Sequence, residues 1–330
     1  MNQGKLITLI GFLAIVSPLS SYAQQPKQPL KHVGLLSQLS CARLPDTLDV
    51  RRLGELGWIE GQTITFDCVS TVGRADQVPA VARELVSLRP DVLVTFPSGY
   101  VIALKRETTT IPIVMLGAWE PVRLGLVADL ARPGGNVTGV AWFDLLSKQM
   151  ELLKEIIPNL RRVAWLSSAL SFSNASPEVI KIVGENQQIV ASALGFTWQA
   201  FLPAVESDYD EIFSRLATEH FDAVNIIWNP YNIHNARRIC ELVLRHRIPA
   251  VSDGPTWANC ELLLIYGQDV SWTHTRDAEY IDKILRGAKP SDLPVEQATK
   301  FDLVVNLKTT KTLGVTVPRS LIARADELIE

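Results

Sequence analysis

Three tryptophans lie where the side chains of α/β proteins usually meet their ligands. Trp119, Trp142 and Trp228 each follow closely upon a short apolar run that is typical of a buried strand. Ligands of parallel sheets bind just outside the carboxyl ends of the strands, and indole rings offer large, flat apolar contact areas there. We therefore interpret the three tryptophans as walls of a binding cleft, with packing inside a hydrophobic core or over a hinge as the alternative.

Polar residues near other strand ends supply the hydrogen bonds that a bound molecule needs. A hydroxyl and free backbone N–H groups at the start of a helix suit a carboxylate, and an acid suits an ammonium group. Helix capping explains Ser98 equally well, and a solvated or capping role explains Glu120 and Asp253 equally well. The candidate ligand-binding residues are Ser37, Ser98, Trp119, Glu120, Trp142, Asn174, Trp228, Asn229 and Asp253. They predict one small organic ligand with a carboxylate and an apolar or aromatic body.

No catalytic or metal-binding pattern emerges from the reactive residue types. The five histidines are dispersed without metal-ligand spacing, and no Gly-x-Ser-x-Gly motif is present. The Gly134-Gly135-Asn136 segment lacks the lysine and hydroxyl of a phosphate loop and is interpreted as a tight turn. Asp208 is interpreted as a helix cap, with Glu211 in the capping-box position. The sequence therefore predicts no enzyme, no cofactor and no metal site.

The elements that must position these side chains alternate between strands and helices. The amphipathic stretch 75–88 places its apolar residues on one helical face, which needs a sheet to cover. Strand, helix and strand joined by short links indicate right-handed crossovers and a parallel sheet. The first group of predicted strands occupies residues 33–36, 64–69, 92–96 and 111–116.

The same alternation starts again after about residue 145 and ends near residue 251. Gly195 closes one of the helices, because a left-handed residue at a helix end favours glycine. The chain is therefore predicted to be an α/β protein with two doubly wound parallel-sheet units. Predicted helices span 145–157, 179–194, 208–219 and 235–246, and predicted strands span 162–167, 197–202, 223–228 and 248–251.

Four cysteines are even in number and match no zinc-binding spacing. Cys41 follows the first predicted strand and Cys68 ends the second, so neighbouring parallel strands would bring both to one sheet edge. Cys240 lies on a predicted helix and Cys260 in a loop beyond the next strand. Two local disulfides, Cys41–Cys68 and Cys240–Cys260, are predicted for an oxidising compartment, with buried free thiols as the alternative.

The N-terminus has the pattern of a cleaved secretory signal. Lys5 precedes an apolar run over residues 6–16, and Ser21-Tyr22-Ala23 fits the small-x-small cleavage pattern. The run is shorter than the roughly 20 apolar residues that span a bilayer. No cysteine at the cleavage point provides a lipid anchor. We expect residues 1–23 to be removed and the mature protein to be free in the periplasm.

Charge and composition exclude other classes of protein. The chain has 32 basic and 35 acidic residues, a net charge of -3, and loss of Lys5 with the signal leaves 31 against 35. This balance gives no basic surface for nucleic acid. Hydrophobic residues make up 47% of the chain, which is too many for a disordered protein. The length suits two domains.

Several segments carry a family resemblance, and RPGGNVTG at residues 132–139 is the most specific of them. Others are ELGWIEGQ at 55–62, IPIV at 111–114, and the stretches 284–295 and 300–309. The chain resembles the bacterial ABC transporter substrate-binding proteins, a family that includes tryptophan- and tyrosine-type receptors. It departs from them at Trp119-Glu120-Pro121-Val122, where the family usually has Gly-Asp-Pro-Val, and at Ser167-Ser168, where the family commonly has Asn-Pro.

The resemblance implies a type I periplasmic binding protein, whose chain crosses the hinge between two lobes three times. We assign residues 31–143 and 253–290 to the first lobe, and residues 144–252 and 291–330 to the second. The predicted function is that of a monomeric periplasmic receptor that delivers an amino acid or an aromatic or carboxylate compound to an ABC transporter permease. The alternatives are a sensory partner of a membrane receptor and an exported enzyme of the same architecture.

Overall fold

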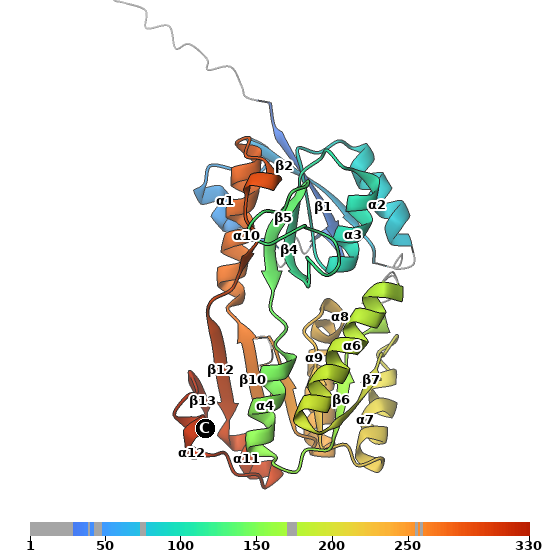
Figure 1. Ribbon diagram of the computed structural model, residues 1–330, viewed down its shortest axis with the longest axis vertical. Helices are drawn as coiled ribbons and strands as arrows, with labels where there is room; N and C mark the ends of the chain where they lie inside the picture. The colour runs from blue at the N-terminus through green and yellow to red at the C-terminus, as the bar shows by residue number, and fades with distance from the viewer. Residues whose placement is uncertain are drawn as a thin grey trace, which may run out of the picture.

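The protein consists of two α/β lobes stacked along its long axis (Figure 1). The structure is a computed structural model that describes residues 29–38, 40–42, 48–72, 77–169, 177–254, 257 and 260–330. The predicted signal peptide and Asn174 lie outside these residues. Within them, no helix has both the length and the apolar character needed to cross a bilayer.

The first lobe is built on a six-stranded parallel sheet with the strand order β11-β5-β4-β3-β1-β2. Its inner strands β1, β3, β4 and β5 are buried on both faces, which explains why they are largely continuous apolar runs rather than alternating ones. Leu35 and Val114 face one core, whereas their neighbours Leu36 and Met115 face the other. The strands are β1 (Lys31–Ser37), β2 (Ile64–Ser70), β3 (Val92–Thr95), β4 (Ile113–Trp119), β5 (Val137–Trp142) and β11 (Glu296–Gln297).

Helices cover both faces of this sheet. Helices α2 and α3 pack on the face that carries Leu36 and Met115, and helices α1 and α10 pack on the opposite face. The bounds are α1 (Val50–Glu55), α2 (Val78–Ser87), α3 (Ser98–Glu107), α10 (Val270–Leu285) and the short η4 (Pro290–Asp292).

The second lobe is built on a seven-stranded sheet with the strand order β13-β12-β10-β9-β8-β6-β7. All of its neighbours are parallel except β10 and β12, which are antiparallel. The strands are β6 (Arg162–Leu166), β7 (Thr197–Phe201), β8 (Ala223–Ile226), β9 (Ala250–Ser252), β10 (Leu264–Gln268), β12 (Phe301–Asn306) and β13 (Glu327–Ile329).

Helices α7 and α9 pack on one face of the second sheet, and helices α4, α6 and α12 pack on the other. The bounds are α4 (Leu146–Ile156), α6 (Pro177–Leu194), α7 (Asp208–Thr218), α8 (Pro230–His234), α9 (Ala236–His246), α11 (Leu307–Leu313) and α12 (Arg319–Ile322). The prediction of two doubly wound α/β lobes is thus confirmed, with one antiparallel pair added in the second.

The chain passes between the lobes at three places: 142–146, 268–270 and 297–301. Two of the lobe boundaries expected from the sequence are wrong. Residues 253–254, 257 and 260–268 belong to the second lobe, because β10 pairs with β9 and β12, and residues 291–297 belong to the first, because β11 pairs with β5. The physical reason is that a buried strand has the same apolar pattern in either sheet, so the pattern does not reveal which sheet receives it.

The start of α7 also differs from the expectation. Ser207 occupies the cap position, and Asp208 lies in the first turn of the helix. The Asp208 carboxylate instead accepts hydrogen bonds from the backbone N–H groups of Ala204 and Val205, at 2.8 and 3.0 Å. It therefore fixes the loop that enters the helix rather than the N–H groups of the helix itself.

Both disulfides of the structure lie within a single lobe. Cys41, which follows β1, is bonded to Cys68 of β2 in the first lobe. Cys240 of α9 is bonded to Cys260, which precedes β10, in the second lobe. Neither bridge links the two lobes, so neither opposes a relative motion of the lobes.

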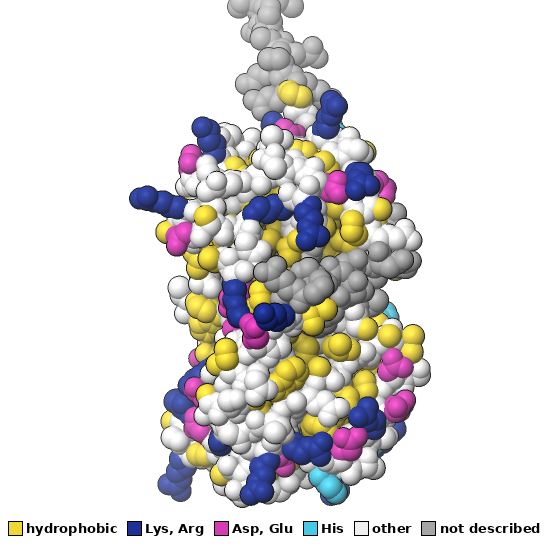
Figure 2. Space-filling view, turned by 45° about the vertical axis from the view of Figure 1, so that its right-hand side comes forward, with side chains coloured by type: hydrophobic (Ala, Val, Ile, Leu, Met, Phe, Trp, Pro, Cys, Tyr) yellow, Lys and Arg dark blue, Asp and Glu magenta, His cyan; other side chains and the backbone are white. Residues whose placement is uncertain are grey.

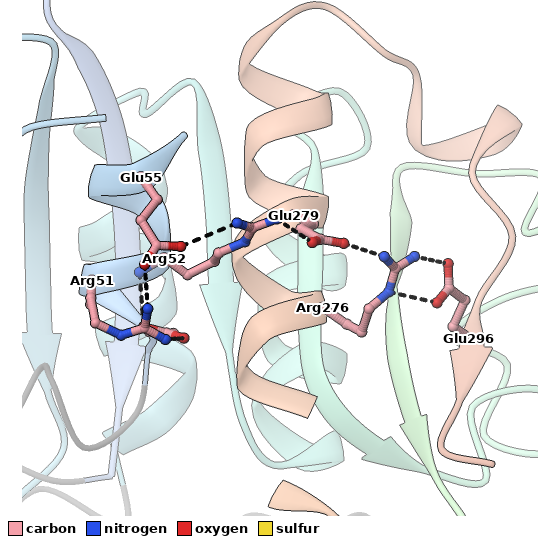
Figure 3. Close-up of polar contacts among 7 residues, drawn as sticks. Arg51, Arg52, Glu55, Arg276, Glu279 and Glu296 are labelled. Atoms are coloured by element: carbon pink, nitrogen blue, oxygen red, sulfur yellow. Dashed lines mark hydrogen bonds and ion pairs between the residues drawn. The ribbon is translucent and has the colours of Figure 1, made fainter. Parts of the chain in front are cut away.

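A chain of ion pairs joins α1, α10 and β11 on the first lobe (Figure 3). Arg52 donates to Glu279 at 2.7 Å and to Glu55 at 3.2 Å. Arg276 bonds Glu279 and also forms a two-pronged pair with Glu296, in which its Nε lies 2.8 Å from Oε2. The shared partner Glu279 makes this a network, and it holds β11 in place just before the last passage between the lobes.

A buried acid without a partner gives the first prediction. Asp277 of α10 is 1% exposed, and neither of its carboxylate oxygens has a hydrogen-bond partner among the described residues. Burial raises the pKa of Asp277 well above its ordinary value of 3.8. Because the folded-state pKa is the higher one, stability is lost as pH rises above the unfolded pKa, by up to about 1.4 kcal/mol per pH unit until the folded pKa is reached.

We expect Asp277→Asn to be more stable than the wild type at about pH 8 and to lose this advantage near about pH 4. Thermal unfolding of both proteins at a series of pH values measures the difference. A difference that does not change with pH would contradict the raised pKa of Asp277, because a carboxyl group with the same pKa in the folded and unfolded states gives stability no pH dependence.

Candidate functional site

A cavity of about 230 Å³ lies between the two lobes and takes its walls from both. The first lobe contributes Phe96, Trp119 and Trp142, and the second contributes Trp228 and Asp253. Figure 2 shows hydrophobic side chains gathered at the waist between the lobes. The position is the one that a two-lobed α/β protein offers to a small molecule.

The strand order explains why these residues meet. Phe96 follows β3, Trp119 ends β4 and Trp142 ends β5, and these three strands are neighbours in the first sheet. Trp228 and Asp253 follow the neighbouring strands β8 and β9 of the second sheet. The carboxyl ends of the two sheets face each other, so side chains that are far apart in sequence line one space.

Three aromatic rings form a cluster that joins the two lobes. The centroids of Phe96 and Trp142 in the first lobe lie 5.0 Å apart, with the rings tilted. The indole of Trp228 in the second lobe meets both of them edge-on, at 5.9 Å from Phe96 and 5.1 Å from Trp142. These distances are in the favourable range for aromatic pairs, so the cluster favours the closed arrangement of the lobes.

Two glycines make room for the two indoles of this cluster. A Cβ at Gly117 would lie 2.1 Å from Nε1 of Trp142, and a Cβ at Gly254 would lie 2.1 Å from Cδ1 of Trp228. Gly117 also has a φ of +89°, which residues with a side chain rarely adopt. Any larger residue at either position would displace an indole from the cavity wall.

Two carboxyl groups, those of Asp253 and Asp144, line the cavity. Asp253 accepts a hydrogen bond from the backbone N–H of Trp228 at 2.8 Å. Burial, together with the negative charge of Asp144, raises the pKa of Asp253 to about 6. Burial likewise raises the pKa of Asp144, although hydrogen bonds from the Leu146 N–H and the Trp119 side chain oppose the shift.

A hydrogen-bonded chain of amides fixes the orientation of Asn225. Gln149 donates its amide N–H to the carbonyl oxygen of Tyr266 at 2.9 Å, so its own oxygen must accept. That oxygen receives the amide N–H of Asn225 at 2.8 Å. The Asn225 side-chain oxygen has no partner among the described residues. Asn225 therefore offers an acceptor at the cavity.

Ser98 lines the cavity, but its hydroxyl is already engaged. Its Oγ accepts the backbone N–H of Trp119 at 2.9 Å and donates to the carbonyl oxygen of Trp119 at 3.0 Å. Pro97 occupies the cap position of α3, and Ser98 is the first helical residue. The hydroxyl therefore fastens the end of β4 to α3, a role that the sequence analysis did not consider.

The other candidate residues have different outcomes. Asn229 lines the cavity, and its side-chain oxygen also caps α8 by accepting the Asn232 N–H at 2.9 Å. Ser37 and Glu120 do not line it. Thr71 bonds the Ser37 carbonyl oxygen through its N–H at 2.9 Å. Glu120 has a φ of +48°, which turns the chain away after β4. Asn174 lies outside the described residues.

The lining residues that sequence reasoning missed include Phe96, Asp144, Gln149 and Asn225. Phe96 ends a predicted strand as the tryptophans do, so the same rule would have found it. Asp144 follows Trp142 by two residues and carried a comparable signal. Gln149 and Asn225 lie inside a helix and a strand, and the sequence carries no signal that distinguishes them from other buried polar residues.

Comparison with known proteins supports this geometry. Residues 50–329 match the family described as ABC transporter substrate binding protein. The tyrosine-binding protein of Clostridioides difficile strain R20291 is 21% identical over 270 residues, which cover 81% of this chain and 75% of that protein.

Two solved structures are similar over nearly the whole described chain. A conserved domain protein from Vibrio cholerae has 25% identity and a TM-score of 0.77, covering 90% of this chain and 99% of that one. A complex with L-Trp from Streptococcus pneumoniae has 24% identity and a TM-score of 0.76, covering 91% and 100%.

Proposed function

Because the chain belongs to the ABC transporter substrate-binding protein family, we propose that it captures one small organic molecule between its lobes and delivers it to the permease of an ABC importer. The observation that carries the proposal is the cavity, whose aromatic walls come from both lobes. A molecule bound there contacts both lobes at once. Binding and lobe closure are therefore coupled.

The contacts between the lobes explain how the coupling works. Trp228 contacts Phe96 and Trp142 across the opening between the lobes, so a rotation that separates the lobes would break these contacts. Arg123, which follows β4, forms an ion pair of 2.7 Å with Glu185 of α6 across the same opening. This pair is exposed and contributes little by itself. The ligand shifts the equilibrium by its difference in affinity for the closed and open states, and the closed form is the one that a permease would recognise.

The walls favour a molecule with an apolar or aromatic body. Six aromatic residues are among the described residues that line the cavity, namely Phe96, Trp119, Trp142, Phe143, Trp165 and Trp228. Relatives named for tyrosine binding and for a complex with L-Trp support an amino acid or an aromatic compound of similar size as the ligand.

The test begins with the protein purified under native conditions. Small molecules released from it by denaturation are identified by mass spectrometry and then titrated back calorimetrically into protein refolded without them. The proposal expects one molecule to bind with a stoichiometry of one. It fails if nothing is released and no candidate nutrient stabilises the protein in thermal unfolding.

Export to the periplasm is part of the same proposal. The pattern Ser21-Tyr22-Ala23 at the end of the N-terminal apolar segment supports cleavage after Ala23. We expect the mature protein to begin at Gln24 and to be recovered with the soluble periplasmic fraction. N-terminal sequencing of the protein from that fraction checks this. Recovery of the protein in the membrane fraction with an intact Met1 would contradict the prediction.

A further inference from the structure

The charged groups on the cavity wall are all of one sign. Asp144 and Asp253 line the cavity, and no lysine, arginine or histidine is among the described residues that do so. The two acids are close enough for the charge of one to act on the other. Two carboxylates beside each other in a partly dry cleft repel unless a positive charge lies near them.

The uncharged polar groups of the wall supply both donors and acceptors, although several donors are used within the protein. The Ser98 hydroxyl proton goes to the Trp119 carbonyl oxygen, and the Gln149 amide proton goes to Tyr266. The Asn186 amide bonds the Asp144 carboxylate. Among the described residues, the side-chain oxygens of Asn225 and Gln187 have no partner, and neither do the indole N–H groups of Trp142 and Trp228. The preference for a positive ligand therefore comes from the two carboxyl groups, because the uncharged groups can bind either a donor or an acceptor.

The aromatic rings add to this preference. The faces of tryptophan and phenylalanine attract cations, most strongly where water is excluded. Helix α3 begins beside the cavity at Ser98. The amino end of a helix carries a partial positive charge of about one half, which disfavours a cation. Two ionised carboxylates outweigh this half charge, so the site as a whole favours a positive ligand.

Resting on the receptor function proposed above, we propose that the ligand is a cation, an amine whose ammonium group lies near Asp253 and Asp144 and whose apolar body lies against the aromatic cluster of Phe96, Trp142 and Trp228. This differs from the carboxylate-bearing ligand that the sequence predicted. A carboxylate would meet two acids and no basic side chain among the described lining residues.

Matched probes of different charge test the proposal on the full mature chain. Tryptamine, L-tryptophan and indole-3-propionate share one ring system and are a cation, a zwitterion and an anion; phenethylamine, phenylalanine and 3-phenylpropionate form a second set. We expect each amine to bind at least about tenfold more tightly than the carboxylate of its set, as measured by calorimetry. Equal or tighter binding of the carboxylates would overturn the cation proposal but would still support a small-molecule receptor.

If no probe binds, the proposal is tested by the molecule released from the native protein, through its net charge at about pH 7. A cation supports the proposal, and a neutral or anionic molecule overturns it. Release of no molecule together with no binding removes both the cation proposal and the receptor function.

Two isosteric variants test whether the ammonium group of the ligand binds near Asp253. Asp253→Asn keeps an oxygen that can accept the Trp228 N–H, yet we expect it to bind the better amine probe about tenfold or more weakly. Asp277→Asn is the control, because Asp277 is likewise an acid whose pKa is raised by burial but lies in α10 and does not line the cavity. An unchanged affinity in Asp253→Asn, or an equal loss in both variants, would overturn the placement of the cation.

The pH dependence gives a readout that a merely structural role would not. The raised pKa of Asp253, about 6, means that its negative charge is lost as pH falls through this value. Amine affinity should therefore fall below about pH 6, by up to about tenfold per pH unit. Asp144, the other titratable group on the wall, acts in the same direction. Amine affinity independent of pH between about 5 and 8 would contradict the proposal.

Discussion

Trp228→Ala is expected to weaken ligand binding by roughly 1–3 kcal/mol, which is about a 5- to 150-fold loss of affinity. Trp228 supplies the second lobe's ring in the aromatic cluster, so its removal deletes both ring contacts across the cleft, with Phe96 and with Trp142. The ligand also loses apolar wall area. The substitution therefore weakens binding in two ways. It removes apolar contact with the ligand, and it removes the ring contacts that stabilise the closed arrangement of the lobes.

Titration calorimetry with the released ligand measures this loss, and Trp198→Ala is its matched control. Trp198 lies on β7 of the same lobe and packs against the core next to Leu160 and Phe196, away from the cavity. We expect Trp198→Ala to lower the melting temperature and to leave affinity unchanged, because its packing lies within one lobe. If Trp228→Ala lowered the melting temperature as much as Trp198→Ala and left affinity intact, Trp228 would be a core residue.

Reduction of the two disulfides is expected to lower the stability of each lobe by roughly 3–4 kcal/mol while ligand affinity changes little. The bridges close loops with sequence separations of 27 and 20 residues, and the loss follows from the greater freedom that the unfolded chain regains. Affinity persists because neither bridge crosses between the lobes, and the motion that binding requires is independent of both.

Denaturant unfolding and calorimetry, each with and without reductant, measure the two quantities. A variant with Cys41→Ser and Cys68→Ser should lose stability in the first lobe only, and the same pair of changes at Cys240 and Cys260 should act on the second. As a control, reductant should have no effect on the variant that lacks all four thiols. A fall in affinity that parallels the loss of stability would contradict the independence of the bridges from lobe motion.

The strand-end rule accounts for what the sequence predicted well. Trp119, Trp142 and Trp228 all line the cavity, because the carboxyl ends of parallel strands meet at one edge of each sheet. The rule is local and needs only the end of an apolar run. It therefore worked without knowledge of the strand order, and the confirmed family and fold followed from short motifs in the same way.

Two errors arise from features that the sequence pattern does not contain. Ser37 ends β1, but the neighbouring residue Gln38 is the one that lines the cavity. The end of an apolar run does not show which of two successive side chains reaches the ligand, because they point to opposite faces of the sheet. Residues 264–268 were assigned to the first lobe although β10 belongs to the second sheet. Its pairing depends on contacts between distant segments, which the local pattern does not show.

The polarity of the cavity was the least predictable feature. Asn225 offers an acceptor only because Gln149 and Tyr266 fix its amide, and these residues come from β8, α4 and β10. Ser98 was expected to serve the ligand or to cap a helix, and its hydroxyl instead bonds Trp119. The hydrogen bonds between residues of different elements decide which donors and acceptors remain free for a ligand. A sequence pattern does not show these hydrogen bonds.

Small-angle X-ray scattering of the ligand-free and ligand-saturated protein tests the central claim most directly. Protein refolded without its ligand should have a larger radius of gyration, and addition of the released molecule should reduce it in proportion to a one-to-one occupancy, because the two walls close on it. A radius of gyration that stays the same at saturating ligand, while calorimetry reports binding, would contradict the claim that the molecule is held between the lobes.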